Sequence, residues 1–150
     1  MNKILTKRVS FALLVIWLII IFIFSSMSGV KSSNLSRVIL SSVTNNVVKR
    51  TDVFDLLHLL LRKSAHICEY IILSALAYSY FKYYIDRNNL LYISILIFVA
   101  VCSIIDEYHQ LFISGRTGKL IDVLIDIAGA IIFLVFIIIR KKNVASRKSN

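Results

Sequence analysis

Nine polar residues, most of them next to long apolar stretches, have side chains that suit acid–base chemistry and anion binding. They are His66, Glu69, Asp106, Glu107, His109, Gln110, Arg116, Asp122 and Asp126. Histidine titrates near neutrality and acts as an acid, a base or a nucleophile. A carboxylate beside it can orient the imidazole ring, and an arginine offers a bidentate fork to a phosphate or a carboxylate. The combination suits phosphoryl transfer or hydrolysis on a lipid head group.

The spacing of these residues places several of them on shared helix faces. His66 and Glu69 are three residues apart, and His109 and Gln110 follow Asp106 at three and four residues. Residues three or four apart lie on the same side of an α-helix. The two aspartates further along the chain are also four residues apart. We therefore expect three helices to bring their polar groups to one end of a bundle.

We predict catalytic roles for four of the nine residues. His66 and His109 are the expected acid, base or nucleophile, and Glu69 and Asp106 orient them. Arg116 is expected to hold a phosphate. The other predicted substrate-binding residues are Gln110, Asp122, Asp126 and Glu107.

Two other interpretations of the same residues stay open. Two histidines with several carboxylates can hold a divalent metal. The sequence has no tight motif such as H-E-x-x-H, so we assign no metal ligand, and the sequence identifies no cofactor. The residues can instead form a purely structural network of buried ion pairs that holds the helices together.

The composition indicates an integral membrane protein. The chain is 58% hydrophobic with a mean hydropathy of +0.80 and no proline, whereas soluble domains are about 45–50% apolar. The formal net charge of +10 does not indicate nucleic acid as a partner. The basic residues flank the apolar stretches, as is typical of membrane proteins. Membrane lipids are the expected partners, and the sequence does not indicate an oligomeric state.

We predict an all-α fold, a four-helix transmembrane bundle with an amphipathic interfacial segment between the first and second spans. The predicted spans cover residues 8–27, 64–82, 90–110 and 120–139. The membrane domain of residues 8–143 then follows a cytoplasmic N-terminus of residues 1–7. A polar, disordered cytoplasmic tail is expected over residues 144–150.

Four spans place both termini on one side of the membrane. That side then has ten basic residues and one acid, Asp86, and the other side has eight basic residues and seven acids. The basic runs next to the first and last spans favour the cytoplasm for the termini. The polar cluster is therefore expected at the outer leaflet.

Two motifs resemble those of the VanZ family of bacterial membrane proteins, which is linked to low-level resistance to the glycopeptide teicoplanin. Residues 62–70 (RKSAHICEY) are similar to the family's R-K-x-x-H-x-x-E-Y, and residues 106–110 (DEYHQ) to its D-E-x-H-Q. The later spacing R-x5-D-x3-D-x2-G is present over residues 116–129. The sequence departs from residues common in the family at Met27, Ser114 and Phe133.

The resemblance implies four helices, both ends in the cytoplasm and a location in the bacterial plasma membrane. It also implies that the protein processes lipid head groups or lipid-linked cell-wall intermediates at the outer leaflet, and that it thereby affects teicoplanin susceptibility. The alternative is a non-enzymatic membrane module that binds an anionic lipid, a glycopeptide or a protein partner through the same polar pocket.

Overall fold

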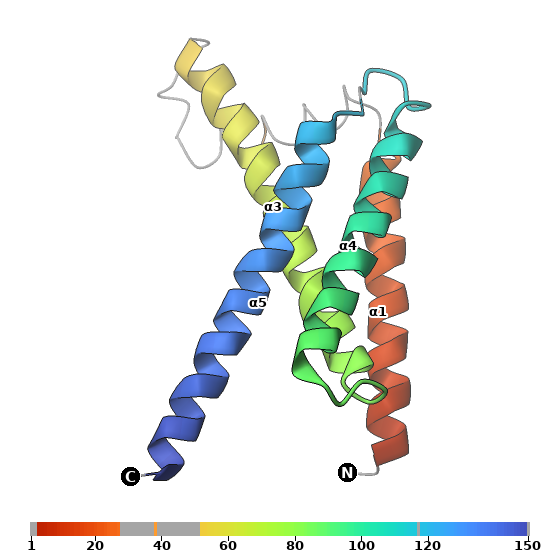
Figure 1. The fold of residues 1–150 in the computed structure, drawn as a ribbon. Coiled ribbons are helices and arrows are strands. Elements are labelled where there is room, and N and C mark those ends of the chain that lie inside the picture. Colours follow the sequence, from red (N-terminus) through yellow and green to blue (C-terminus); the bar gives the residue numbers. More distant parts are fainter. Residues whose placement is uncertain (1–2, 28–37, 39–51, 117, 150) are drawn as a thin grey trace.

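The protein is all-helical in the residues that the computed structural model describes, which are 3–27, 38, 52–116 and 118–149 (Figure 1). No strand occurs in these residues. The helices are α1 (Lys3–Ser25), α3 (Asp52–Phe81), α4 (Asn88–Gln110) and α5 (Leu120–Ser149). The predicted fold class, an all-α helical bundle, is confirmed.

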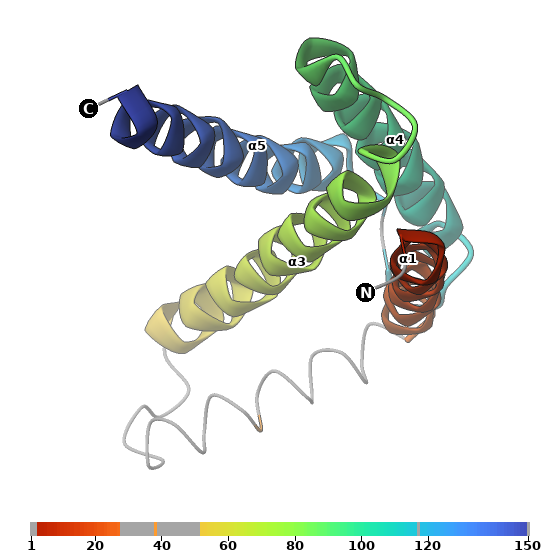
Figure 2. The same ribbon diagram turned by 90° about the horizontal axis from the view of Figure 1, so that it is seen from below.

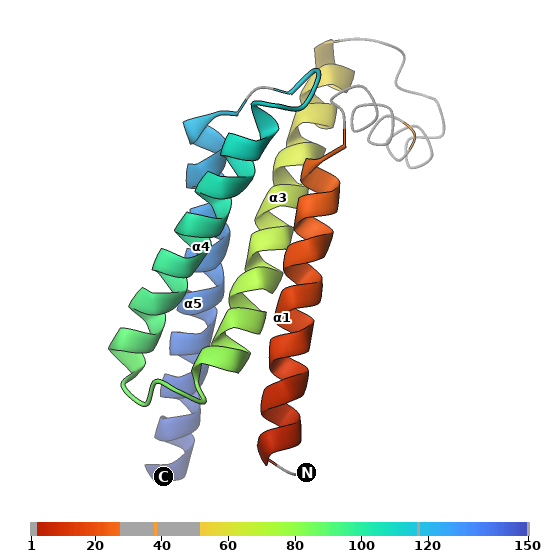
Figure 3. The ribbon, with the colours of Figure 1, turned by 90° about the vertical axis from the view of Figure 1, so that its right-hand side faces the viewer.

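Helix α3 contacts each of the other three helices and packs more extensively than any other helix of the described residues. Helix α4 packs against α1 and α5 as well, whereas the described residues of α1 and α5 make no contact with each other. Helices α3 and α5 cross in the view of Figure 1 and diverge when seen from below (Figure 2). Figure 3 shows both ends of the chain at the same end of the bundle.

Each helix buries a narrow apolar stripe and exposes the rest of its apolar surface. The buried residues of α4 recur every four positions, as a helix facing a core requires. The buried apolar core consists of Leu14, Ile21, Tyr70, Leu73, Ala77, Leu91, Ile95, Val99, Ala130 and Leu134. The outer faces expose large side chains such as Ile16, Ile97 and Phe136 at half or more of their surface. Lipid is the natural solvent for these faces.

Among the residues that the structure describes, three helical segments are long and apolar enough to cross a membrane, namely Ile4–Ser25, Asn88–Gln110 and Leu120–Arg147. Helix α3 has 30 residues and is therefore roughly 45 Å long, which exceeds the thickness of a bilayer core. The N-terminal half of α3 contains several charged residues, and its C-terminal half is mostly apolar. The structure thus supports a membrane protein, and a crossing by α3 remains a prediction.

Helices α3 and α5 extend furthest beyond their predicted limits, and α1 also begins earlier than predicted, at Lys3 instead of residue 8. Helix α3 begins at Asp52, so the apolar patch of residues 53–61 belongs to the same helix as the predicted second span. Helix α5 continues to Ser149, so the prediction of a disordered tail from residue 144 was wrong. Basic side chains follow one another in the last turns of α5, where they complement the negative end of the helix dipole. The predicted interfacial helix lies largely outside the described residues.

Gly129 allows α5 to approach α3 closely. A Cβ atom at this position would lie 2.8 Å from the carbonyl oxygen of Ile67, which belongs to the rigid backbone of α3. Gly129→Ala should therefore push the two helices apart and cost about 1–3 kcal/mol of stability, although alanine favours helices more than glycine does. Thermal unfolding of the purified protein in detergent measures the loss.

Ile132→Ala is the matched control, because Ile132 lies on the same helix and is 52% exposed on the lipid-facing side. Its unfolding temperature should stay close to that of the wild type. Equal stability of Gly129→Ala and the wild type would contradict the close approach of the helices.

Candidate polar site at one end of the bundle

The predicted polar residues lie at the end of the bundle opposite the chain termini (Figure 1). The middle of α3, the last turns of α4, the first turns of α5 and the loop between α4 and α5 meet there. A cavity of about 250 Å³ opens between α3, this loop and the start of α5. Its lining consists of Leu59, Arg62, Lys63, His66, Gln110, Gly115, Arg116, Lys119, Ile121 and Asp122.

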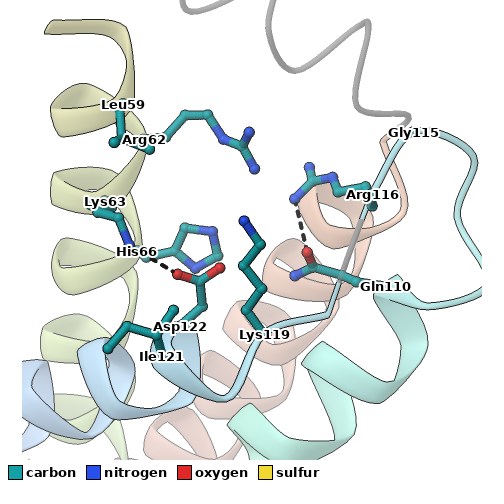
Figure 4. Close-up of a pocket in the computed structure, with 10 residues that line it drawn as sticks. All are labelled: Leu59, Arg62, Lys63, His66, Gln110, Gly115, Arg116, Lys119, Ile121 and Asp122. Atoms are coloured by element: carbon teal, nitrogen blue, oxygen red, sulfur yellow. Dashed lines mark hydrogen bonds and ion pairs between the residues drawn. The ribbon is translucent and has the colours of Figure 1, made fainter. Parts of the chain in front are cut away.

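The cavity has an excess of positive charge. Four basic side chains line it, and the only acid among the lining residues is Asp122. That acid is already paired, because Lys63 Nζ lies 3.1 Å from its Oδ1. Arg62 and Lys119 form no ion pair with any residue in the described part of the chain. Figure 4 shows both side chains pointing into the space between α3 and the loop.

Arg116 is held by three hydrogen bonds. Its Nε donates to the carbonyl oxygen of Met27 at 3.0 Å, and its Nη2 donates to that of Phe24 at 3.1 Å. Its Nη1 donates to Gln110 Oε1 at 3.3 Å (Figure 4). Arginine has five N–H donors, so two of them remain for a ligand. The guanidinium thus closes the end of α1 and still faces the cavity.

Burial lowers the pKa of the Arg116 guanidinium, and the like charge of Arg62 lowers it further. Carboxylates in the neighbourhood oppose this shift; they are Asp106, Glu107 and Glu69. Arginine keeps its proton at neutral pH, because its ordinary pKa exceeds 12. The positive charge of Arg62 is therefore close enough to act on Arg116.

Two carboxylates behind the cavity are occupied by local hydrogen bonds. Gln110 Nε2 donates to Asp106 Oδ2 at 2.9 Å and to Glu107 Oε1 at 3.3 Å. The other oxygen of Glu107 accepts the backbone N–H of Lys119 at 2.8 Å. The bond from Lys119 fastens the loop to α4. A Cβ atom on Gly118 would overlap the carbonyl oxygen of Glu107, so the loop also needs a glycine there.

His66 links the cavity to a fully buried carboxylate. Its Nδ1 lies 3.4 Å from Asp126 Oδ1, an ion-pair distance rather than a well-formed hydrogen bond. The other oxygen of Asp126 accepts a hydrogen bond from Ser103 Oγ at 2.6 Å. Asp126 is 0% exposed, and so is Tyr70, whose buried hydroxyl has no partner among the described residues. A polar path therefore runs from the cavity into the core.

His109 faces a different neighbour. Its Nε2 lies 3.1 Å from Ser26 Oγ, and its ring packs at 4.5 Å between centroids on Phe22 of α1. It does not line the cavity. Glu69 does not line it either, but its half-buried carboxyl interacts electrostatically with His66 and Arg116. The two histidines predicted to act together therefore face different surroundings.

The structure divides the nine predicted residues into three groups. Four of them line the cavity: His66, Gln110, Arg116 and Asp122. Three lie behind it and contact these or the loop: Asp106, Glu107 and Asp126. The remaining two, Glu69 and His109, lie outside its lining.

Sequence reasoning missed three contributors to the site. The sequence did not indicate Lys119 or Ser103 as site residues. Arg62 was recognised only as part of the motif over residues 62–70 and not as a ligand-binding residue. Ser103 lies three residues before Asp106, so helical spacing could have placed it on the same face. Lys119 lies in a loop, where no periodic pattern indicates which way a side chain points.

The fold and the site together define a class, an all-helical membrane protein with a basic polar cavity at one end of the bundle. The family model VanZ/LLP1 matches residues 10–141, and the chain belongs to this family. The resemblance found in the two motifs is thereby confirmed. Comparisons with curated proteins and with solved structures gave no match.

Asp126 should contribute to the stability of the protein, because its buried carboxylate accepts a hydrogen bond from Ser103. Asp126→Leu leaves the Ser103 hydroxyl without its partner in the core and removes the ion-pair contact of His66, which costs about 1–3 kcal/mol. Asp126→Asn keeps an oxygen for Ser103 and should lose much less. Thermal unfolding in detergent compares the two variants.

The exposed carboxylate Asp86 provides the control, since Asp86→Asn removes the same charge without touching the core. Its unfolding temperature should equal that of the wild type. If Asp126→Leu is as stable as Asp126→Asn, the buried hydrogen bond does not contribute as described.

Proposed function

We propose that the cavity binds the phosphate of a lipid head group or of a lipid-linked cell-wall intermediate, and that His66 carries out acid–base chemistry on it. One observation supports the proposal most directly. The side chains of Arg62, Arg116 and Lys119 surround a cavity of about 250 Å³, and no carboxylate in the described part of the chain forms an ion pair with any of them.

Like charges around a half-buried cavity repel one another. An anion bound between them offsets this repulsion, because it attracts each of the cations. A phosphate group supplies the charge and accepts hydrogen bonds from guanidinium and ammonium donors. The two free N–H groups of Arg116 can donate to the same anion as Arg62. The site therefore favours a phosphate over a neutral head group.

The apolar part of the lining favours a lipid over a free phosphate. Leu59 and Ile121 belong to the cavity wall and are 47% and 52% exposed. They continue the apolar outer faces of α3 and α5. A lipid with its phosphate in the cavity would lay its chain along these faces. Lateral entry from the surrounding membrane fits this arrangement.

The contact with Asp126 gives His66 a defined role. A carboxylate next to Nδ1 favours the tautomer that carries the proton there, so the lone pair of Nε2 is available to a ligand. As a general base, Nε2 would take a proton from a water molecule or an acceptor hydroxyl as its oxygen attacks phosphorus. The imidazolium would then return the proton to the leaving oxygen. The surrounding cations would stabilise the charge on the phosphoryl oxygens.

The second candidate is a module that binds the same anion without changing it. The three hydrogen bonds that hold Arg116 favour this alternative, because they make the guanidinium a structural anchor. Processing would change the lipids or precursors at the cell surface, whereas binding alone would sequester them, and either effect would change susceptibility to teicoplanin. Turnover distinguishes the two candidates.

Binding and turnover should separate between two variants. Arg62→Gln removes an unpaired cation and should weaken binding of a prenyl phosphate by about tenfold to a hundredfold. His66→Gln should leave the affinity within about threefold and reduce turnover by a factor of about 10²–10⁴. Affinities are measured on the purified protein, and turnover by comparing the lipid profiles of membranes with and without it.

Lys82→Gln is the charge-matched control for binding, because this exposed lysine lies at the other end of the bundle. A wild type that binds the lipid and changes no lipid species supports the non-enzymatic module. Binding that is equal in Arg62→Gln and Lys82→Gln would remove the cavity from consideration. Preference for a prenyl alcohol over the phosphate would also contradict the proposal.

We also propose that this end of the bundle faces the cell exterior and that the termini are cytoplasmic. A cysteine in place of the exposed Ser114 should then react with an impermeant thiol reagent in intact cells, whereas one in place of Asp86 should not. The native Cys68 and Cys102 are replaced by alanine beforehand. Labelling of the Ser114 position only after permeabilisation would reverse the orientation.

A further inference from the structure

A second concave surface lies at the other end of the bundle, where the chain termini are. It has a volume of about 320 Å³ and lies between the first turns of α1 and the end of α3. Its lining consists of Ile4, Lys7, Arg8, Phe11, Tyr80 and Tyr84. None of these residues contributes to the cavity around His66, so the two sites are separate.

Two tyrosines form the polar centre of this groove. The hydroxyl groups of Tyr80 and Tyr84 lie 2.9 Å apart, and the Tyr80 ring contacts the Phe11 ring in a tilted arrangement with 5.3 Å between centroids. A hydrogen bond between two hydroxyls uses only one of their two protons. The other proton is free to be donated to a ligand.

Two cations flank the tyrosine pair. Lys7 Nζ lies 4.1 Å from the centroid of the Tyr84 ring, which fixes the ammonium group at the groove. Arg8 follows it on α1. Neither forms an ion pair with an acid in the described part of the chain. The groove thus offers two positive charges and a hydroxyl donor, and no carboxylate lines it.

Apolar walls adjoin these polar groups. Ile4 is 62% exposed and Phe11 is 51% exposed, and both line the groove. Helix α1 is long and apolar enough to cross the membrane from Ile4 onward. Tyrosine and lysine at the end of such a helix lie at the level of the lipid head groups. An occupant must therefore combine an anionic polar part with acyl chains.

We infer that this groove binds the head group of an anionic phospholipid from the leaflet nearest the chain termini. The phosphate accepts hydrogen bonds from Lys7, from Arg8 and from the free tyrosine proton, while the acyl chains pack on Ile4 and Phe11. The inference does not depend on the function proposed for the other end of the bundle.

The test uses the full-length protein in nanodiscs or detergent and titrates phosphatidylglycerol against phosphatidylcholine, with bound lipid counted by native mass spectrometry. The wild type should prefer phosphatidylglycerol. Lys7→Gln removes a charge-assisted hydrogen bond to the phosphate and should weaken phosphatidylglycerol binding about tenfold. The double variant Lys7→Gln/Arg8→Gln removes two such bonds and should weaken it roughly a hundredfold.

Lys142→Gln is the matched control, because Lys142 is exposed at the same end of the bundle and does not line the groove. It should bind phosphatidylglycerol like the wild type. Tyr84→Phe removes only a hydroxyl and should weaken binding about twofold to tenfold, which tests the site even if the double variant does not fold. Equal losses in Lys7→Gln and Lys142→Gln, or no lipid preference in the wild type, would overturn the inference.

Discussion

The arrangement of the polar end depends on the Arg116 guanidinium, which binds carbonyl oxygens at the end of α1 and the side-chain amide of α4 at the same time. Helix α1 makes no contact with α5 in the described residues, and Arg116 ties the end of α1 to the loop that leads into α5. The last carbonyls of a helix lack intrahelical partners and carry negative partial charge. A fixed cation satisfies both needs in a membrane, where water does not reach every group.

The hydrogen bonds around Arg116 keep the acidic side chains of the site apart from the basic ones. Gln110 accepts a hydrogen bond from Arg116 and donates to Asp106 and Glu107, while Glu107 holds the loop by a backbone N–H. Asp126 is turned into the core toward Ser103. The carboxylates are thus used within the protein, whereas Arg62 and Lys119 remain directed into the cavity. The motifs contain nearly equal numbers of acids and bases, and the fold separates them so that a ligand meets mostly bases.

Much of the fold followed from the sequence, since apolar stretches and the charges between them predicted α4 and the start of α5 to within two residues. The start of α3 did not follow, because its first turns mix charged and apolar residues and look like a surface segment. The clustering of the polar residues at one end was also predicted. The neighbour that each polar side chain contacts could not be predicted in this way. Asp106, His109 and Gln110 lie on one broad side of α4, and the packing of the other helices decides which of them contacts α1 and which contacts the loop. The role of Ser103 as a partner of Asp126 could not be predicted, because a serine within an apolar run is typical of a small residue that packs between helices.

The pair formed by Ser26 and His109 has the distance of a nucleophile and its base, but its protons are arranged the other way round. The hydroxyl of Ser26 donates its single proton to the carbonyl oxygen of Phe22 at 2.7 Å. It can therefore only accept from His109 Nε2, which must carry the proton itself. Ser26 at the end of α1 thus favours a proton on Nε2 of His109, and the serine is a hydrogen-bond acceptor for the ring rather than a nucleophile activated by it.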